Sequence, residues 1–109
     1  MEVLKLADLK EEGNGAYSMK TAFQESLGDC GVKVGRVVIR AGEQVPLTGV
    51  SKHTENEYSI ILKGSLVTEI GGEKIHVSAG EATFIPKGEE HIATNNGEED
   101  CELVFVLVG

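Results

Sequence analysis

Closely spaced turn residues in the second half of the chain leave no room for helices between strands. They recur at intervals of seven to nine positions, as Gly64, Gly71-Gly72, Gly80, Gly88 and Asn95-Asn96-Gly97. Such intervals hold strands of five or six residues, whereas a helical crossover between parallel strands needs a dozen or more. We therefore expect antiparallel sheets.

Short runs rich in β-branched residues are separated by Gly, Pro and Asn from residue 32 onward. They cover residues 32–39, 58–62, 66–70, 75–77, 83–85 and 103–108. The pair Gly71-Gly72 predicts a tight hairpin, because both central residues of such a turn can take positive φ. Eight or nine strands without a covering helix must close on themselves or pair as two sheets. This pattern predicts an all-β barrel or jelly roll.

The length of 109 residues fits one domain, 1–109, with an apolar core of its own. We expect residues 1–20 to form an N-terminal arm with at most one helical turn and little core. The barrel is expected over 32–108.

Charge and cysteine usage exclude several classes of protein. With 18 acidic and 10 basic side chains the net charge is −8, which repels nucleic acid and anionic membranes. The chain has no 18-residue apolar window and its first residues do not resemble a signal peptide, so we expect a cytoplasmic protein. Cys30 and Cys101 form no Cys-x-x-Cys motif; reduced thiols are expected, with a disulfide between them left open.

The segment 57–63 is partly apolar on both faces. Tyr58, Ile60 and Leu62 alternate with Ser59 and Ile61. One face should line the barrel interior, and the other needs a cover from a second sheet or another subunit. We therefore expect the protein to form a homodimer.

Two of the three histidines stand beside predicted strands and near carboxylates. His53 precedes Glu57 by four residues, and His91 follows a Gly-rich turn, whereas His76 alternates with apolar residues and should face solvent. Two histidines and one carboxylate are a common ligand set for first-row divalent metals and leave coordination positions open. His53 and Glu57 would lie about 13 Å apart in one continuous strand, so the chain must bend at 54–56 for them to share an ion.

The segment 80–95 resembles the second motif of the cupin family, Gly-x5-Pro-x-Gly-x2-His-x3-Asn. All five fixed positions match: Gly80, Pro86, Gly88, His91 and Asn95. The first motif, Gly-x5-His-x-His-x3-4-Glu-x6-Gly, is matched in its second half by His53, Glu57 and Gly64. Its first half is altered, because Ser51 replaces the first histidine and Gly42 lies nine rather than six residues before it.

The resemblance implies a double-stranded β-helix, or cupin jelly roll, over about 32–108. It also implies that His53, Glu57 and His91 bind a divalent ion, Fe, Mn, Ni or Zn, inside the barrel. Ser51 shares a strand face with His53 and is either a strand-end residue or a group that supports the site. The histidines can alternatively be hydrogen-bonded barrel residues without a metal, and Glu57 a catalytic base or an acid at a loop junction.

Two classes of function follow. One is a metal-dependent enzyme acting on a small molecule, since cupins include oxygenases, decarboxylases, lyases and isomerases. The other is a binding or sensing module that holds a small ligand, either without metal or with a structural ion. The retained polar ligands favour either class over a purely structural protein.

Overall fold

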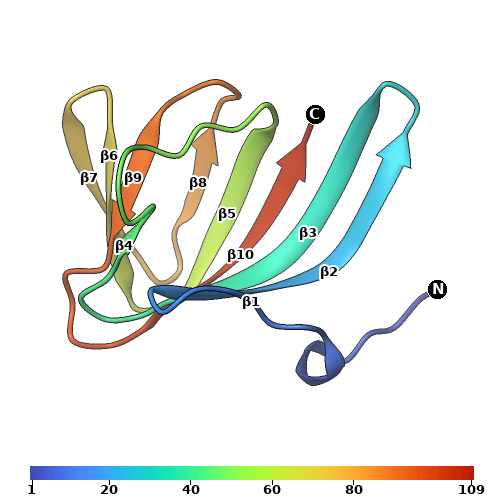
Figure 1. Cartoon of the computed structure of the whole chain (residues 1–109), viewed down its shortest axis with the longest axis horizontal. Coiled ribbons are helices and arrows are strands. Elements are labelled where there is room, and N and C mark those ends of the chain that lie inside the picture. The colour runs from blue at the N-terminus through green and yellow to red at the C-terminus, as the bar shows by residue number, and fades with distance from the viewer.

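The computed structural model describes all 109 residues and consists of two antiparallel sheets (Figure 1). The larger sheet has the order β1-β2-β3-β10-β5-β8: Glu12–Gly13, Tyr17–Leu27, Cys30–Ile39, Cys101–Val108, Asn56–Lys63 and Ala82–Ile85. The smaller sheet has the order β4-β9-β6-β7: Gln44–Val45, His91–Thr94, Ser65–Ile70 and Glu73–Ser78. The predicted antiparallel jelly roll is confirmed.

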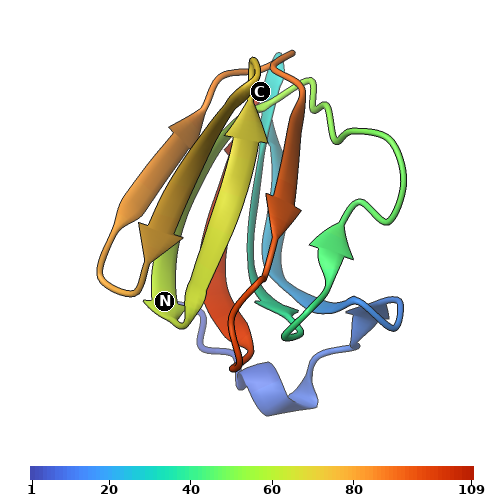
Figure 2. The same ribbon diagram turned by 90° about the vertical axis from the view of Figure 1, so that its left-hand side faces the viewer.

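The tight turns lie where the sequence predicts them. Strands β6 and β7 form a hairpin in which Ile70 pairs with Glu73, and Gly71 and Gly72 both have positive φ, 58° and 81°. Gly64 has a φ of 76°, and a Cβ there would lie 2.7 Å from the backbone oxygen of Asp100. At this glycine the chain leaves the six-stranded sheet and enters the four-stranded one, as Figure 2 shows from the side.

The core lies between the sheets, on the inner side of β10 and its neighbours. Its buried apolar members are Ile39, Ile61, Leu66, Val77, Cys101, Leu103 and Phe105. Along β10 the inward residues Cys101, Leu103 and Phe105 alternate with half-buried outward residues. The period of two follows from strand geometry. Because Val104, Val106 and Val108 on the other face are also apolar, the structure rather than the sequence assigns the inner face of β10.

The N-terminal region differs in part from expectation. The single helical turn is present at Leu6–Asp8, labelled η1. Strand β2, however, begins at Tyr17, inside the segment for which we expected little core, and Ala16 is only 2% exposed. The strand pairs with β3 from Tyr17 opposite Ile39 to Leu27 opposite Cys30. This pairing stabilises a sequence in which polar and apolar residues are mixed and Thr21 is the only β-branched residue.

The two cysteines cannot form a disulfide within one chain. Cys30 begins β3, whereas Cys101 pairs with Ile39 at the other end of that strand. Nine residues of strand span about 30 Å, far beyond the Cα separation of a disulfide. Both are free thiols, and Cys101 is fully buried. Burial, and secondly the negative charge of Glu99, raises the pKa of the Cys101 thiol to about 11.

No helix of the structure has the length and hydropathy needed to span a membrane.

Candidate metal centre

Three side chains converge between the two sheets. One imidazole nitrogen of His53, one of His91 and a carboxylate oxygen of Glu57 all lie within 4.8 Å of one another. The His53 Nε2 to Glu57 Oε1 distance is 3.9 Å, and the His91 Nε2 to Glu57 Oε2 distance is 3.8 Å. Both imidazoles therefore face the same carboxylate. The structure brings together the three residues that the sequence singled out.

Glu57 enters the site from the inner face of β5. It shares that face with Ser59 and Ile61, both buried, while Tyr58 and Ile60 point outward. The Glu57 side chain keeps only 20% of its surface exposed. A carboxylate this buried needs a compensating cation or hydrogen-bond donors. The two histidines are placed so that they could bind the same cation as Glu57.

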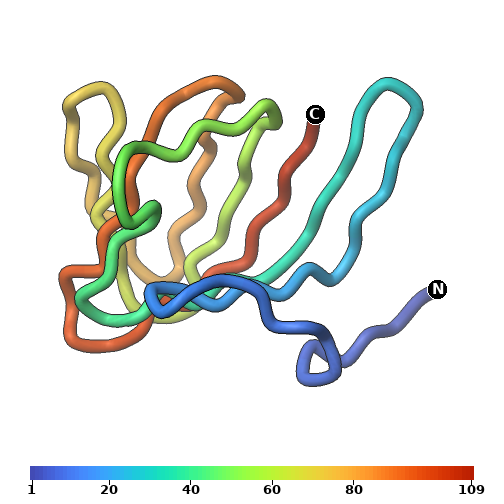
Figure 3. Tube along the Cα trace, viewed as in Figure 1, coloured from blue at the N-terminus to red at the C-terminus, as the bar shows by residue number.

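The predicted bend between His53 and Glu57 is present. Strand β5 begins at Asn56, and Thr54 and Glu55 form a bend before it, while His53 lies in irregular structure. The connection from β4 to β5 crosses from the smaller sheet to the larger one (Figure 3). Two hydrogen bonds from the opposite turn hold it in place. The Gly88 N–H donates to the His53 carbonyl at 2.8 Å, and the Lys87 N–H donates to Asn56 Oδ1 at 3.0 Å.

His91 is the most firmly oriented of the three donors. It begins β9, is 7% exposed, and its Nδ1 lies 3.1 Å from the Glu89 carbonyl oxygen. A carbonyl only accepts, so this contact assigns the ring proton to Nδ1. The Nε2 lone pair then faces Glu57, which is the tautomer that a metal-binding histidine requires.

Ser51 lies directly beside His91. The Ser51 N–H donates to the His91 carbonyl at 2.8 Å, and the His91 N–H donates to the Ser51 carbonyl at 3.0 Å. Directly opposed residues of an antiparallel pair project to the same face, with Cβ atoms about 5 Å apart. The Ser51 side chain is therefore on the site's face, and it lines the cavity.

The donor separations fit a divalent ion. Nitrogen and oxygen ligands at about 2.0–2.2 Å from one ion lie about 3 to 4 Å from each other. The two distances to Glu57 fall in this range, and the widest separation, 4.8 Å, exceeds it by less than 1 Å. Neutral imidazole and carboxylate suit Fe, Mn, Ni and Zn. The group can therefore hold a metal ion, with positions left for water or a ligand.

The three donors form part of the wall of a cavity of about 910 Å³ between the sheets. About half of its lining residues are hydrophobic, with Ile61, Leu66, Leu103 and Phe105 among them. Tyr17 and Met19 of β2 also line it, and sequence reasoning missed them because the polar sequence of β2 gave no signal of a strand. The volume is that of a typical small-molecule site.

The other conspicuous residues are not part of this group. His76 is exposed on β7, as predicted, and its Nδ1 lies 3.3 Å from the Ser78 hydroxyl. Asn95 is fully buried: its Nδ2 donates to the carbonyls of Ile39 and Glu99, and its Oδ1 accepts from the Gly97 N–H. Its role is to fix the chain after β9.

The fold is a small β-barrel whose cavity carries a group of potential metal ligands. The sequence model of the cupin domain family matches residues 35–107 of this chain. This chain belongs to the cupin family.

Comparisons with individual protein sequences add two relatives. TcmJ, the tetracenomycin polyketide synthase protein of Streptomyces glaucescens, is 29% identical over 82 residues, which are 75% of this chain and 54% of TcmJ. YdeC, an uncharacterised HTH-type transcriptional regulator of Bacillus subtilis (strain 168), is 36% identical over 56 residues, 51% of this chain and 19% of YdeC. The chain thus spans about half of TcmJ and about a fifth of YdeC.

The crystal structure of a predicted oxalate decarboxylase from Thermotoga maritima superimposes with a TM-score of 0.77 at 24% identity, covering 97% of both chains. At this identity the likeness concerns the fold.

Proposed function

We propose that the protein binds one divalent metal ion through His53, Glu57 and His91 and acts there on a small molecule in the cavity. The observation that carries the proposal is the convergence of these three donors on the wall of a cavity of about 910 Å³. When bound, the ion supplies a Lewis acid or redox centre, the chemistry of oxygenases, lyases, decarboxylases and isomerases.

The chain's own residues prepare the site for that ion. The Glu89 carbonyl holds the proton of His91 on Nδ1 and so keeps Nε2 available as a donor. Glu57 contributes the negative charge that balances part of the ion's charge. The hydrophobic residues of the lining offer contact to the apolar part of a ligand.

The cavity lining favours a ligand that has both an apolar surface and oxygen donors. The chain has two arginines: Arg36 pairs with Glu102, and neither it nor Arg40 lines the cavity. Lys33 is the only lysine in the lining. A compact dianion such as oxalate would thus have few cationic partners beyond the ion. The similarity to TcmJ, named as a polyketide synthase protein, supports an oxygen-rich polyketide as the ligand class.

Metal content after purification without chelators tests this function. Elemental analysis should find about one ion per chain, and Glu57→Gln and His91→Ala should each lose it. Glu55→Gln is the matched control, because Glu55 also lines the cavity but lies outside the donor group. Metal that is substoichiometric and insensitive to both site changes would overturn the proposal.

A second candidate is a binding or sensing module that holds the same kind of ligand without converting it. The 36% identity to part of the regulator YdeC favours it. Incubation of the metal-loaded protein with candidate polyketides distinguishes the two. A ligand that raises the melting temperature of the protein and is recovered unchanged supports the binding module. A product that forms with the wild type and does not form with Glu57→Gln supports the enzyme.

We also propose a homodimer in a reducing, cytoplasmic environment. The outward side chains of β5 support the dimer, since Tyr58, Ile60 and Leu62 are about half exposed. The exposed free thiol of Cys30 suits a reducing compartment.

A further inference from the structure

Two hydroxyl side chains line the cavity between the candidate metal ligands and the apolar core. Ser59 lies between Glu57 and the core residue Ile61 on the inner face of β5, and Thr83 of β8 is paired directly with it. Directly paired residues of an antiparallel sheet project to the same face, with Cβ atoms about 5 Å apart. Ser59 and Thr83, called the hydroxyl pair below, therefore stand side by side on the cavity wall.

The Ser59 hydroxyl has no partner within the protein although the residue is buried. Ser59 is 9% exposed, and the side-chain hydrogen bonds of the structure include neither it nor Thr83. Every side-chain oxygen or nitrogen that is closed off from solvent does have a partner. The Ser59 Oγ is therefore open to the cavity and can hydrogen-bond a ligand there.

The missing side chain of Gly35 gives this hydroxyl its access. Phe105 of β10 is paired with Ser59 on one side and with Gly35 of β3 on the other. The Phe105 ring extends over the glycine, since its Cε1 and Cζ lie 2.8 Å from the position that a Cβ would take there. The ring thus leans toward β3 and away from Ser59. The wall at the hydroxyl pair is left open to a ligand.

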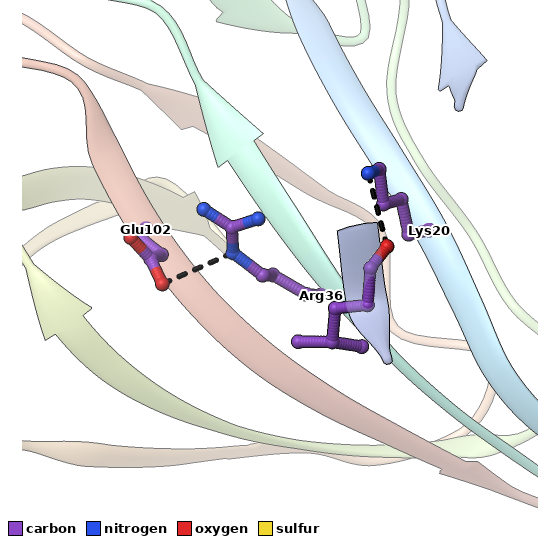
Figure 4. Close-up of polar contacts among 4 residues, drawn as sticks. Lys20, Arg36 and Glu102 are labelled. Atoms are coloured by element: carbon purple, nitrogen blue, oxygen red, sulfur yellow. Dashed lines mark hydrogen bonds and ion pairs between the residues drawn. The ribbon is translucent and has the colours of Figure 1, made fainter. Parts of the chain in front are cut away.

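The row of the inner face that contains the hydroxyl pair carries no charge. Its members, from β2 to β8, are Thr21, Gly35, Phe105, Ser59 and Thr83. Arg36 follows Gly35 and projects from the outer face, where its Nε donates to Glu102 Oε1 at 3.0 Å (Figure 4). Hydroxyls in a row without a cation suit a neutral oxygen, such as that of a ketone or a phenol, better than a carboxylate.

We propose that the hydroxyl pair binds a ketone or phenol oxygen of a ligand whose other oxygens bind the metal ion. This inference rests on the proposed function for its first anchor, the ion held by His53, Glu57 and His91, and adds a second anchor. Glu57 and Ser59 are two residues apart on one strand face, a separation of about 7 Å. One aromatic ring with oxygens on opposite sides can span the two anchors. The ligand class is therefore a flat aromatic compound oxygenated on both sides.

Two probes that differ in one oxygen test the proposal. Danthron, a dihydroxyanthraquinone, and dithranol, the corresponding anthrone, share a ketone between two hydroxyls on one side of the central ring. Only danthron has a second ketone on the opposite side. The protein is loaded with Zn²⁺, which has no redox chemistry, and titrated under nitrogen so that dithranol is not oxidised. The wild type should bind danthron about tenfold more tightly than dithranol, because only danthron reaches the hydroxyl pair.

Ser59→Ala should remove most of this preference. We expect about tenfold weaker binding of danthron and a change of less than about twofold for dithranol. Structural damage would instead weaken the binding of both probes. Thr83→Val, which keeps the shape of the side chain, should also reduce the preference, and it replaces Ser59→Ala if circular dichroism shows that this variant does not fold. Ser26→Ala is the matched control, because Ser26 lines the cavity from β2, and it should keep the wild-type preference.

A wild type that binds both probes equally, or binds neither, would overturn the proposed subsite. A preference for danthron that survives both Ser59→Ala and Thr83→Val would overturn it as well. Metal content of the same variants reports separately on the proposed function, because neither hydroxyl belongs to the donor group and all variants should keep the ion. A wild type that holds no ion would overturn that function, and the preference between the probes can then be measured on the ion-free protein.

Discussion

Ser51 and His91 exchange two backbone hydrogen bonds, of 2.8 Å and 3.0 Å, so that the side chain where the family motif has a histidine stands beside a candidate metal ligand. The neutral serine hydroxyl is a poor metal ligand and does not replace the histidine of the family motif. The pairing nevertheless preserves the backbone position from which a fourth ligand would reach the ion.

Ser51→His should therefore tighten metal binding. We expect at least a tenfold lower dissociation constant, about 1.4 kcal/mol, because a fourth ligand is added on an existing backbone. Isothermal titration with Zn²⁺ or Mn²⁺ measures it. Lys52→His is the control, since the intervening side chain projects to the other face. Equal gains in both variants would contradict the assignment of Ser51 to the site.

Gly35→Ala should destabilise the barrel by about 1 to 3 kcal/mol. A Cβ at this buried residue would lie 2.5 Å from the Lys20 carbonyl oxygen and 2.8 Å from the Phe105 ring. Urea unfolding followed by circular dichroism gives the change. Gly15→Ala is the comparison, because nothing lies within 4 Å of a Cβ there, and a similar loss in both variants would rule out the predicted clash.

Asn95→Ala should cost about 2 to 4 kcal/mol of unfolding free energy. Its amide makes three hydrogen bonds in a fully buried position, and the change leaves the carbonyls of Ile39 and Glu99 and the Gly97 N–H without this partner. Asn96→Ala, at the exposed next residue, should change stability by less than about 0.5 kcal/mol. Thermal unfolding of the two variants measures the difference in their loss of stability. Equal losses would show that water can replace the Asn95 amide and would contradict the prediction.

Stability should fall at high pH because of Cys101. Its pKa rises from 9.0 to about 11 on folding, so between these values the folded state holds a proton that the unfolded state has lost. This thiol contributes on the order of 2 to 3 kcal/mol to the free energy of unfolding. The contribution is fully present below pH 9 and is lost as the pH rises toward 11. Urea titrations across pH 8–11 should show this loss in the wild type and a smaller one in Cys101→Val.

The same burial predicts unequal thiol reactivity. Ellman's reagent should modify Cys30, which is exposed, within the time in which Cys101 stays unmodified in the folded protein. Two equally fast thiols under native conditions would contradict the buried position of Cys101.

Much of the barrel could be predicted because its information is local. Gly71-Gly72 indicates a tight hairpin through its turn geometry, and the run of apolar residues over 103–108 indicates a strand through its composition. The bend before Glu57 followed from a distance argument alone. These features need no knowledge of distant partners.

Other features depend on contacts far apart in the sequence. Strand β2 has a polar sequence and becomes a strand through its pairing with β3, so Tyr17 and Met19 could not be placed in the cavity wall. The hydrogen bond from the Ala41 N–H to the Asp100 carboxylate, two residues separated by 59 positions, illustrates the same point. The pairing of Ser51 with His91 was equally invisible, because it joins an irregular segment to a strand of the other half.

The alternation along β5 makes that strand intolerant of an inserted or deleted residue. Its even-numbered side chains from Tyr58 to Leu62 face outward and its odd-numbered ones from Glu57 to Ile61 face the cavity. An inserted or deleted residue would therefore bring a carboxylate to the exterior and aromatic bulk to the donor group at once. We expect a mutagenesis library to accept no change of length within this strand, whereas single substitutions at the half-exposed Tyr58, Ile60 and Leu62 should be tolerated better than at the buried Ser59 and Ile61.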